Sequence, residues 1–152
     1  PMEQKEDIMK RCPKCGREVY PSISTAILVL VRKEDSLLLV HARNFKGTFN
    51  SLVAGFLETG ETLEECVARE VKEETGLDIA GCRYLFSIPN LYPYSGFEVH
   101  TVDMFFECLT ESFDGAKAED DAAEIIILPA NQLNPDDFGL QSIKKAVDRY
   151  IK

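Results

Sequence analysis

Apolar residues recur at helical spacing in two parts of the chain. Residues 63–75 carry them at every third or fourth position, and residues 141–151 do the same near the end of the sequence. Thr62 followed by Glu65 has the form of a capping box, which predicts that the first helix begins directly after Thr62. Gly76 has the form of a helix C-cap and predicts its end. The residues expected to face the core from this helix are Leu63, Val67 and Val71.

Apolar and β-branched runs bounded by polar turns predict the strands. Residues 24–32 and 37–42 flank a polar turn, which indicates a hairpin, and residues 49–56 predict a strand that leads to the loop before the first helix. Further strands are expected at residues 77–79 with 82–88, at 99–109 and at 124–128. Strands on both sides of a central helix, with a second helix at the end, predict an α+β chain folded as an α/β/α sandwich with a mixed sheet.

The connection between two of these strands, residues 89–97, contains two prolines and is expected to be a loop. It also carries Tyr92, Tyr94 and Phe97. Aromatic loops often cover only the edge of a core, but such a loop beside an active site can stack on a base or ring. Both interpretations stay open at this point.

Three glutamates gather near the end of the first predicted helix. Glu70, Glu73 and Glu74 stand at positions i, i+3 and i+4, so they share one side of the last turn. Like charges at this spacing repel by roughly 0.2–0.5 kcal/mol per pair, and the negative end of the helix dipole adds a penalty of similar size. A hard divalent cation with oxygen ligands would turn this cost into a binding site.

The spacing around these glutamates resembles that of a known family. Residues 55–77 read GFLETGETLEECVAREVKEETGL, in which Gly55, Glu61 and the run REVKEETGL at 69–77 match the signature box of the Nudix hydrolases. A glutamate-rich helix is more often a solvated face, but nine matched positions outweigh that interpretation. The resemblance implies a metal-dependent hydrolase with the Nudix fold, which is the α/β/α sandwich already predicted.

The resemblance also implies roles for individual residues. The implied ligands of Mg²⁺ or Mn²⁺ are Glu70, Glu73 and Glu74, the backbone carbonyl of Ala54, and Asp121 with Glu119 in reserve. Either Glu70 or Glu74 would act as the catalytic base. Arg69 would hold a glutamate in position through charge-assisted hydrogen bonds. Glu61 would order the loop or serve as an outer ligand.

The similarity extends over roughly residues 12–133 and points to the NADH pyrophosphatase branch, which carries a zinc ribbon and an AGF sequence like that at 54–56. Two features depart from that branch. The first cysteine pair of the ribbon is missing, and residues 87–94 read SIPNLYPY where the branch has SQPWPFP. The resemblance therefore implies diphosphatase chemistry and leaves the substrate open.

Aromatic residues are the candidates for binding the substrate's ring. In the branch that this chain resembles, the residue matching Phe56 stacks on a bound nicotinamide from the partner subunit, and a homodimer is the usual assembly. We therefore expect Phe56, with Tyr92 and Tyr94, to contact the substrate. The alternative for Phe56 is a hydrophobic plug beneath the loop.

Charge and composition restrict the partners. The net charge of −9 argues against nucleic acid or an anionic membrane as the main partner, since such binders need a basic face. The charged residues 1–7 lack the apolar stretch of a signal peptide, and the apolar run at 26–31 is too short to cross a bilayer. Five cysteines indicate reduced thiols or metal ligation. We expect a cytoplasmic protein.

A short knuckle precedes the main domain. Cys12 and Cys15 lie in the sequence CPKCG, which supplies half of a tetrahedral zinc site. A zinc held by one chain, a remnant without metal and a site shared between chains all stay open. The expected division is residues 1–22 for the segment with the knuckle and 23–152 for the hydrolase domain.

The function expected from the sequence is metal-dependent hydrolysis of a pyrophosphate bond in a nucleoside diphosphate linked to another group. NADH, NAD and ADP-ribose are the candidate substrates. One alternative is a housecleaning pyrophosphatase acting on nucleoside triphosphates, which would share the metal site and differ in the pocket. A second alternative is a Nudix module that senses nucleotides without catalysis, although no glutamate of the box is lost.

Overall fold

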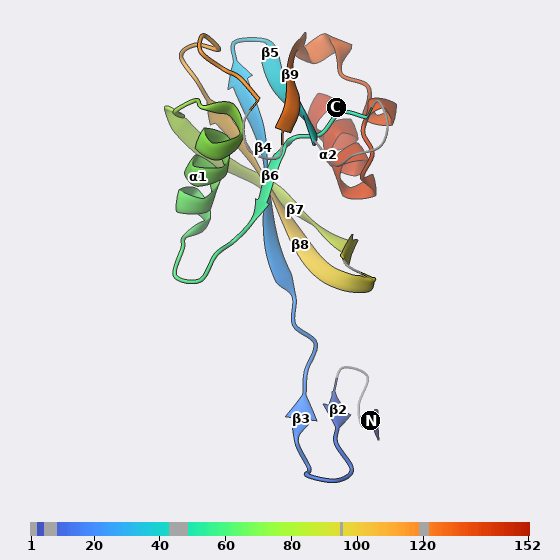
Figure 1. Ribbon diagram of the computed structural model, residues 1–152. Helices are drawn as coiled ribbons and strands as arrows, with labels where there is room; N and C mark the ends of the chain where they lie inside the picture. The colour runs from blue at the N-terminus through green and yellow to red at the C-terminus, as the bar shows by residue number, and fades with distance from the viewer. Residues whose placement is uncertain (1–2, 5–8, 43–48, 95, 119–121) are drawn as a thin grey trace.

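The computed structural model describes residues 3–4, 9–42, 49–94, 96–118 and 122–152. In this part of the chain, one mixed sheet forms the centre of the molecule (Figure 1). Its strands are β4 (Ser24–Lys33), β5 (Ser36–Ala42), β6 (Val53–Phe56), β7 (Gly81–Tyr94), β8 (Phe97–Leu109) and β9 (Ala122–Pro129). The strand order is β7-β8-β4-β5-β9, with β6 paired to β4 beside this path.

Strand β4 is the axis of the sheet. It runs parallel to β8 from Ser24 to Arg32, whereas its other neighbours are antiparallel. The first half of β4 pairs with β6, and its last residues pair with β5. Strands β5 and β6 therefore lie on the same side of β4, one after the other along its length. The chain continues from the end of β6 into the loop before α1.

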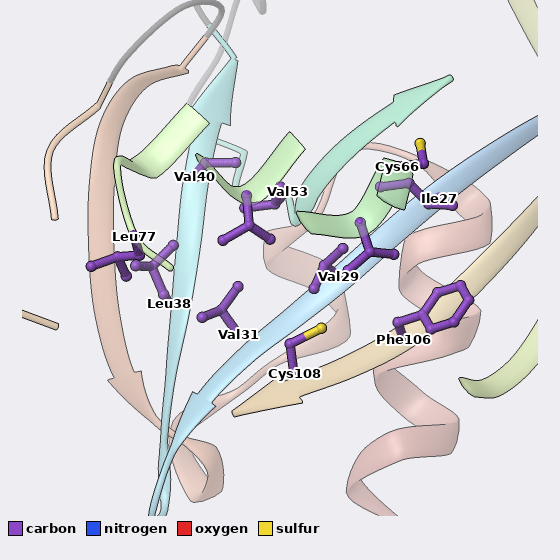
Figure 2. Packing of buried hydrophobic residues seen from close by; sticks show 12 residues of the cluster. Ile27, Val29, Val31, Leu38, Val40, Val53, Cys66, Leu77, Phe106 and Cys108 are labelled. Atoms are coloured by element: carbon purple, nitrogen blue, oxygen red, sulfur yellow. The ribbon is translucent and has the colours of Figure 1, made fainter. Parts of the chain in front are cut away.

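Helix α1 (Leu63–Thr75) and helix α2 (Gln141–Ile151) lie on opposite faces of the sheet (Figure 1). Successive side chains of β4 point to opposite faces of the sheet, as the two-residue period of a strand requires, and pack in the core on the α1 side or on the α2 side. Ile27, Val29 and Val31 pack in the cluster that contains α1, and Leu28 and Leu30 pack with α2. Figure 2 shows the first of these clusters around β4. The α+β architecture with a mixed sheet is confirmed.

The bounds of both predicted helices are confirmed. The Thr62 side chain accepts a hydrogen bond from the Glu65 backbone, and the Glu65 side chain accepts one from the Thr62 backbone. Gly76 ends α1 with φ 76°, a left-handed conformation that glycine adopts at little cost. These signals are local in sequence, so the helix ends could be located without the rest of the fold.

The prediction of a loop at residues 89–97 is wrong. Strand β7 continues through both prolines to Tyr94, and β8 begins at Phe97. Pro89 pairs with Val102, and β7 lies at the edge of the sheet. A proline lacks a backbone N–H but is tolerated in an edge strand, where that N–H would face away from the ladder. The aromatic residues of this region therefore lie on a hairpin.

Two smaller differences concern strand ends. Strand β6 begins at Val53, and the preceding Asn50 and Ser51 make only single bridges. Residues 77–79 are not part of a strand. Two 3₁₀ turns, Ala130–Gln132 and Pro135–Asp137, connect β9 to α2.

A small sheet formed by β1 (Glu3–Gln4), β2 (Lys10–Arg11) and β3 (Glu18–Val19) precedes the main sheet. Cys12 and Cys15 lie in the turn between β2 and β3, and Figure 1 shows this turn at the far end from α1. Among the described residues, no helix is both long and apolar enough to cross a membrane.

Candidate active site

Arg69 on α1 is the centre of a hydrogen-bond network. Its Nε donates to Glu61 Oε1 at 2.6 Å, and its Nη2 donates to Glu61 Oε2 at 3.0 Å. Its Nη1 donates to Glu70 Oε1 at 2.7 Å and to Glu73 Oε2 at 3.3 Å. The guanidinium also reaches the carbonyl of Phe56 at 3.2 Å. One side chain thus joins the loop, two glutamates of the helix and the end of β6.

This network fixes the loop as well as the helix. The backbone N–H of Glu58 donates to Glu61 Oε2 at 3.0 Å. The hydrogen bonds from Arg69, followed by that from Glu58, lower the pKa of Glu61 to about 2. Arg69 in turn has its pKa raised, chiefly by its hydrogen bonds to Glu61. Glu61 therefore stays ionised at any physiological pH.

Gly55 leaves room for the carboxylate of Glu70. A Cβ atom at Gly55 would lie 2.1 Å from both the Glu70 Cδ and Oε1 atoms, closer than real contacts allow. Gly55 pairs with Ile27 inside the sheet, so its backbone has little freedom to move away. The glycine of the box is thus required by close approach of a carboxylate to the strand.

The three glutamates of the helix differ in burial. Glu70 and Glu74 are buried, with exposed fractions of 9% and 8%, whereas the side chain of Glu73 is 46% exposed. Among the described residues, no three His, Cys, Asp or Glu side chains are grouped closely enough to hold a metal ion. The Arg69 guanidinium lies between Glu70 and Glu73, bonded to both. Asp121 and Glu119 lie outside the described residues.

A pocket of about 310 Å³ opens beside Glu74. Ala54, Gly55 and Phe56 of β6 line one side of it, and Asn90, Tyr92 and Asp103 of the β7–β8 hairpin line another. Much of the remaining lining is apolar, from Leu28, Leu52 and Leu140. The pocket therefore joins Glu74 of α1 to an apolar space that could accept a ring.

Two aromatic side chains border this space. The rings of Phe56 and Tyr92 lie edge to face, with centroids 6.0 Å apart and an interplanar angle of 72°. Phe56 is 43% exposed, which favours contact with a ligand over a hydrophobic plug beneath the loop. The backbone of Tyr94 pairs with Phe97 at the end of the hairpin, but its side chain lies outside the described residues.

The polar residues of the pocket were not predicted from the sequence. Asp103 accepts a hydrogen bond from Thr101 Oγ1 at 2.8 Å and one from Asn90 Nδ2 at 3.3 Å. A signal was available, because Asp103 is an acidic residue inside a long, largely apolar strand. Its contact with Asn90 could not be predicted, because Asn90 was expected in a loop and lies in β7, which continues through the prolines.

The cysteines differ in their surroundings. All five are free thiols. Burial raises the pKa of Cys66 to about 12 and also raises that of Cys108, so both stay protonated and suit packing better than metal binding. The pKa of Cys12 is lowered, first by a backbone hydrogen bond from Cys15 and then by one from Lys14. This environment favours a thiolate at the turn, but the turn supplies only two of the four ligands that a structural zinc needs.

Comparison with known proteins places these features in context. A family model described as the NUDIX domain matches residues 22–150. The chain is 48% identical over 82 residues to the "NAD-capped RNA hydrolase NudC" of Photobacterium profundum, which covers 54% of this chain and 31% of that protein. It is 40% identical over 123 residues to the protein of that name from Salmonella agona, covering 80% and 41%.

The chain thus spans less than half the length of these curated relatives. Among solved structures, the E. coli dihydroneopterin triphosphate pyrophosphohydrolase is similar with a TM-score of 0.70 and 18% identity, over 84% of this chain and 94% of that one. At this identity the likeness concerns the fold alone.

Proposed function

The chain belongs to the NUDIX domain family, and from this premise we propose that it hydrolyses a pyrophosphate bond in a nucleoside diphosphate linked to a second group. The observation that carries the proposal is the close approach of Glu70 to Gly55. This approach places a buried carboxylate, bonded to Arg69, against the strand that lines the pocket.

Two buried carboxylates and a backbone carbonyl at this end of α1 are donors of the kind that a divalent metal ion prefers. Glu70 and Glu74 are buried one helical turn apart, and Glu74 lines the pocket together with Ala54. Carboxylate and backbone carbonyl oxygens are the ligands that Mg²⁺ and Mn²⁺ prefer. We propose that Glu70, Glu73, Glu74 and the carbonyl of Ala54 hold the metal, with Asp121 as a further ligand. Such an ion would neutralise charge on the phosphoryl oxygens and activate the attacking water.

The chain's own residues would carry the remaining steps. A water attacks one phosphorus in line with the bridging oxygen, the P–O bond to that oxygen breaks, and the products are two phosphate monoesters. Glu70 or Glu74 takes the proton of the water. Arg69 keeps Glu70 oriented through its 2.7 Å hydrogen bond. Burial of Glu70 and Glu74 beside the pocket reduces competition from bulk water.

The pocket suits a substrate with a ring beyond the pyrophosphate. Phe56 and Tyr92 offer aromatic contact at its border, and we propose that they bind this ring, with Tyr94 as a further contact. The relatives named above are NAD-capped RNA hydrolases. We therefore place a nicotinamide dinucleotide, free or at an RNA end, first among the substrates, followed by ADP-ribose. The acidic charge of the chain favours the free dinucleotide.

Further proposals concern assembly and zinc. We propose a homodimer, which would let Cys12 and Cys15 of two chains together complete one zinc site. Metal analysis would then give about one zinc per two chains. The free thiols favour a reducing compartment, in agreement with the expected cytoplasmic location.

A substrate panel with Mg²⁺ or Mn²⁺ tests the proposed reaction. NAD⁺, NADH, ADP-ribose, a short NAD-capped RNA, diadenosine polyphosphates and damaged nucleoside triphosphates are compared by product analysis. Release of two monophosphates from a dinucleotide supports the proposal. Release of inorganic pyrophosphate from triphosphates alone would favour the housecleaning alternative, and binding without any turnover would favour the sensor.

A further inference from the structure

The hairpin β7–β8 places a polar cluster in the apolar pocket. Asp103 is only 4% exposed, yet it lines the pocket together with Thr101 and Asn90. These three side chains lie on adjacent strands, since Asn90 pairs with Thr101 in the β7–β8 register. They lie outside the carboxylates of α1, and the proposed hydrolysis assigns them no role.

The carboxylate of Asp103 retains unused acceptor capacity. An ionised carboxylate has about four acceptor positions. The described residues supply two donors, Thr101 Oγ1 at 2.8 Å and Asn90 Nδ2 at 3.3 Å, and both are neutral groups. A buried carboxylate without a cationic partner is costly unless hydrogen bonds satisfy it. A ligand that brings further N–H donors into the pocket would meet this need.

The partners of Asp103 reinforce its preference for donors. A threonine hydroxyl has one hydrogen, and that of Thr101 is directed to Asp103 Oδ1, so Thr101 can only accept a bond from a ligand. Asn90 keeps its carbonyl oxygen as an acceptor and one of its two amide hydrogens as a donor. The polar part of the pocket therefore offers more acceptors than donors. A ligand carboxylate in the same place would face the like charge of Asp103.

We propose that Asp103 determines substrate specificity by accepting a hydrogen bond from an amine or amide N–H of the substrate's planar ring. This inference rests on the proposed function, because it places the ring of that substrate in the pocket beside Glu74. Phe56 and Tyr92 contact the ring, and Asp103 accepts a hydrogen bond from the N–H at its polar edge. Rings that carry a carboxylate at this edge, or that lack an N–H donor there, are bound more weakly.

Pairs of dinucleotides that differ by one donor group test the proposal. NAD⁺ and nicotinic acid adenine dinucleotide differ only at the pyridine ring, where a carboxylate replaces the amide. NAD⁺ and an analogue with unsubstituted purine in place of adenine differ only in the amine of the purine. Dissociation constants are measured by calorimetry without divalent metal, and kcat/KM is measured with Mg²⁺, for the wild type and Asp103→Asn. Glu111→Gln, an exposed carboxylate beyond the end of β8, is the control.

The wild type is expected to prefer NAD⁺ in at least one pair by about ten- to a hundredfold, because the analogue leaves a buried acceptor unpaired. Asp103→Asn should reduce that preference to roughly threefold or less, since an amide can also donate. The pair whose preference depends on Asp103 identifies the ring, pyridine or purine, that enters the pocket. Glu111→Gln should keep the wild-type preference.

Equal preference in the wild type and Asp103→Asn, or no preference in the wild type, would overturn the proposal. Asp103→Ser gives the same comparison if the asparagine variant does not fold. The binding measurement distinguishes a failure of the proposed hydrolysis from a failure of the proposed role of Asp103. Absence of hydrolysis with a preference that depends on Asp103 contradicts the proposed function alone, whereas hydrolysis without that preference contradicts the role of Asp103 alone.

Discussion

Arg69 and Glu61 form a bidentate ion pair across the loop that precedes α1, with N···O distances of 2.6 and 3.0 Å. The pair joins the start of the box to its helix, and the same guanidinium holds Glu70. A planar fork with fixed donors can make all these bonds at once, which the single ammonium group of lysine cannot.

Arg69→Lys is therefore expected to lower kcat/KM roughly ten- to a hundredfold and to weaken the apparent Mg²⁺ affinity, because an oriented carboxylate loses its support. Steady-state kinetics at several Mg²⁺ concentrations measure both effects. Lys72→Arg, a conservative exchange of an exposed base on the same helix, should change neither. Full activity of Arg69→Lys would show that the network is only structural.

Gly55→Ala places a methyl group 2.1 Å from the Glu70 carboxylate and must displace it. We expect a loss of about 1–3 kcal/mol in the free energy of unfolding and a large fall in turnover. Adding Glu70→Ala should restore much of the stability while activity stays low, which a double-mutant cycle would measure.

Gly81→Ala is the matched control, since a Cβ there meets nothing within 4 Å. Strictly additive effects of Gly55→Ala and Glu70→Ala would contradict the close contact between these two residues.

Phe56→Ala is expected to raise KM for a dinucleotide roughly five- to tenfold, because one aromatic contact contributes on the order of 1 kcal/mol. The kcat for a minimal substrate without the second ring should hardly change. The melting temperature should also change little, since Phe56 is 43% exposed. Tyr84→Ala removes another exposed aromatic that packs edge to face, on Phe106, and should leave KM unaltered. Equal losses on long and short substrates, with a large drop in melting temperature, would indicate a plug.

Features encoded by neighbouring residues were predictable from the sequence. The ends of α1 follow from Thr62, Glu65 and Gly76, whose hydrogen bonds and backbone conformation involve residues within one turn. The spacing of Arg69 and the glutamates likewise depends only on helix geometry. These parts of the site could therefore be placed before the fold was known.

Features that depend on strand pairing were not predictable in the same way. The prolines at 89 and 93 indicated a loop, and only the edge position of β7 explains why a strand tolerates them. The contact of Asp103 with Asn90 follows from the register of that hairpin. The difference in burial between Glu73 and Glu74 also required the packed sheet.

Tyr150 donates a 2.6 Å hydrogen bond to the buried Glu107, which also accepts from Arg83 and Arg32. Burial by itself raises the pKa of Glu107, but the hydrogen bond from Tyr150 and the charges of the two arginines outweigh it, so this pKa lies below its ordinary value of 4.5. The stabilisation is therefore present above pH 4.5 and is lost as the pH falls through the folded-state pKa.

Tyr150→Phe removes the hydroxyl donor and is expected to lower the free energy of unfolding by about 1–2 kcal/mol at pH 7. The difference from the wild type should shrink on acidification. Urea denaturation at a series of pH values measures it, with Tyr84→Phe as the exposed control. A difference that stays constant on acidification, down to the lowest pH at which both proteins still fold, would show that Tyr150 does not act through the Glu107 carboxylate.

The dependence of turnover on Mg²⁺ in a Glu74→Gln variant is the sharpest test of the proposed metal site. The amide keeps the size of the side chain and loses the charge that would hold the cation, so kcat at saturating Mg²⁺ should fall about a hundredfold or more with the fold intact. Glu73→Gln should behave in the same way. Glu64→Gln, an exposed glutamate in the first turn of the same helix, should match the wild type. Near-normal turnover of Glu74→Gln at saturating Mg²⁺ would contradict the metal site proposed here.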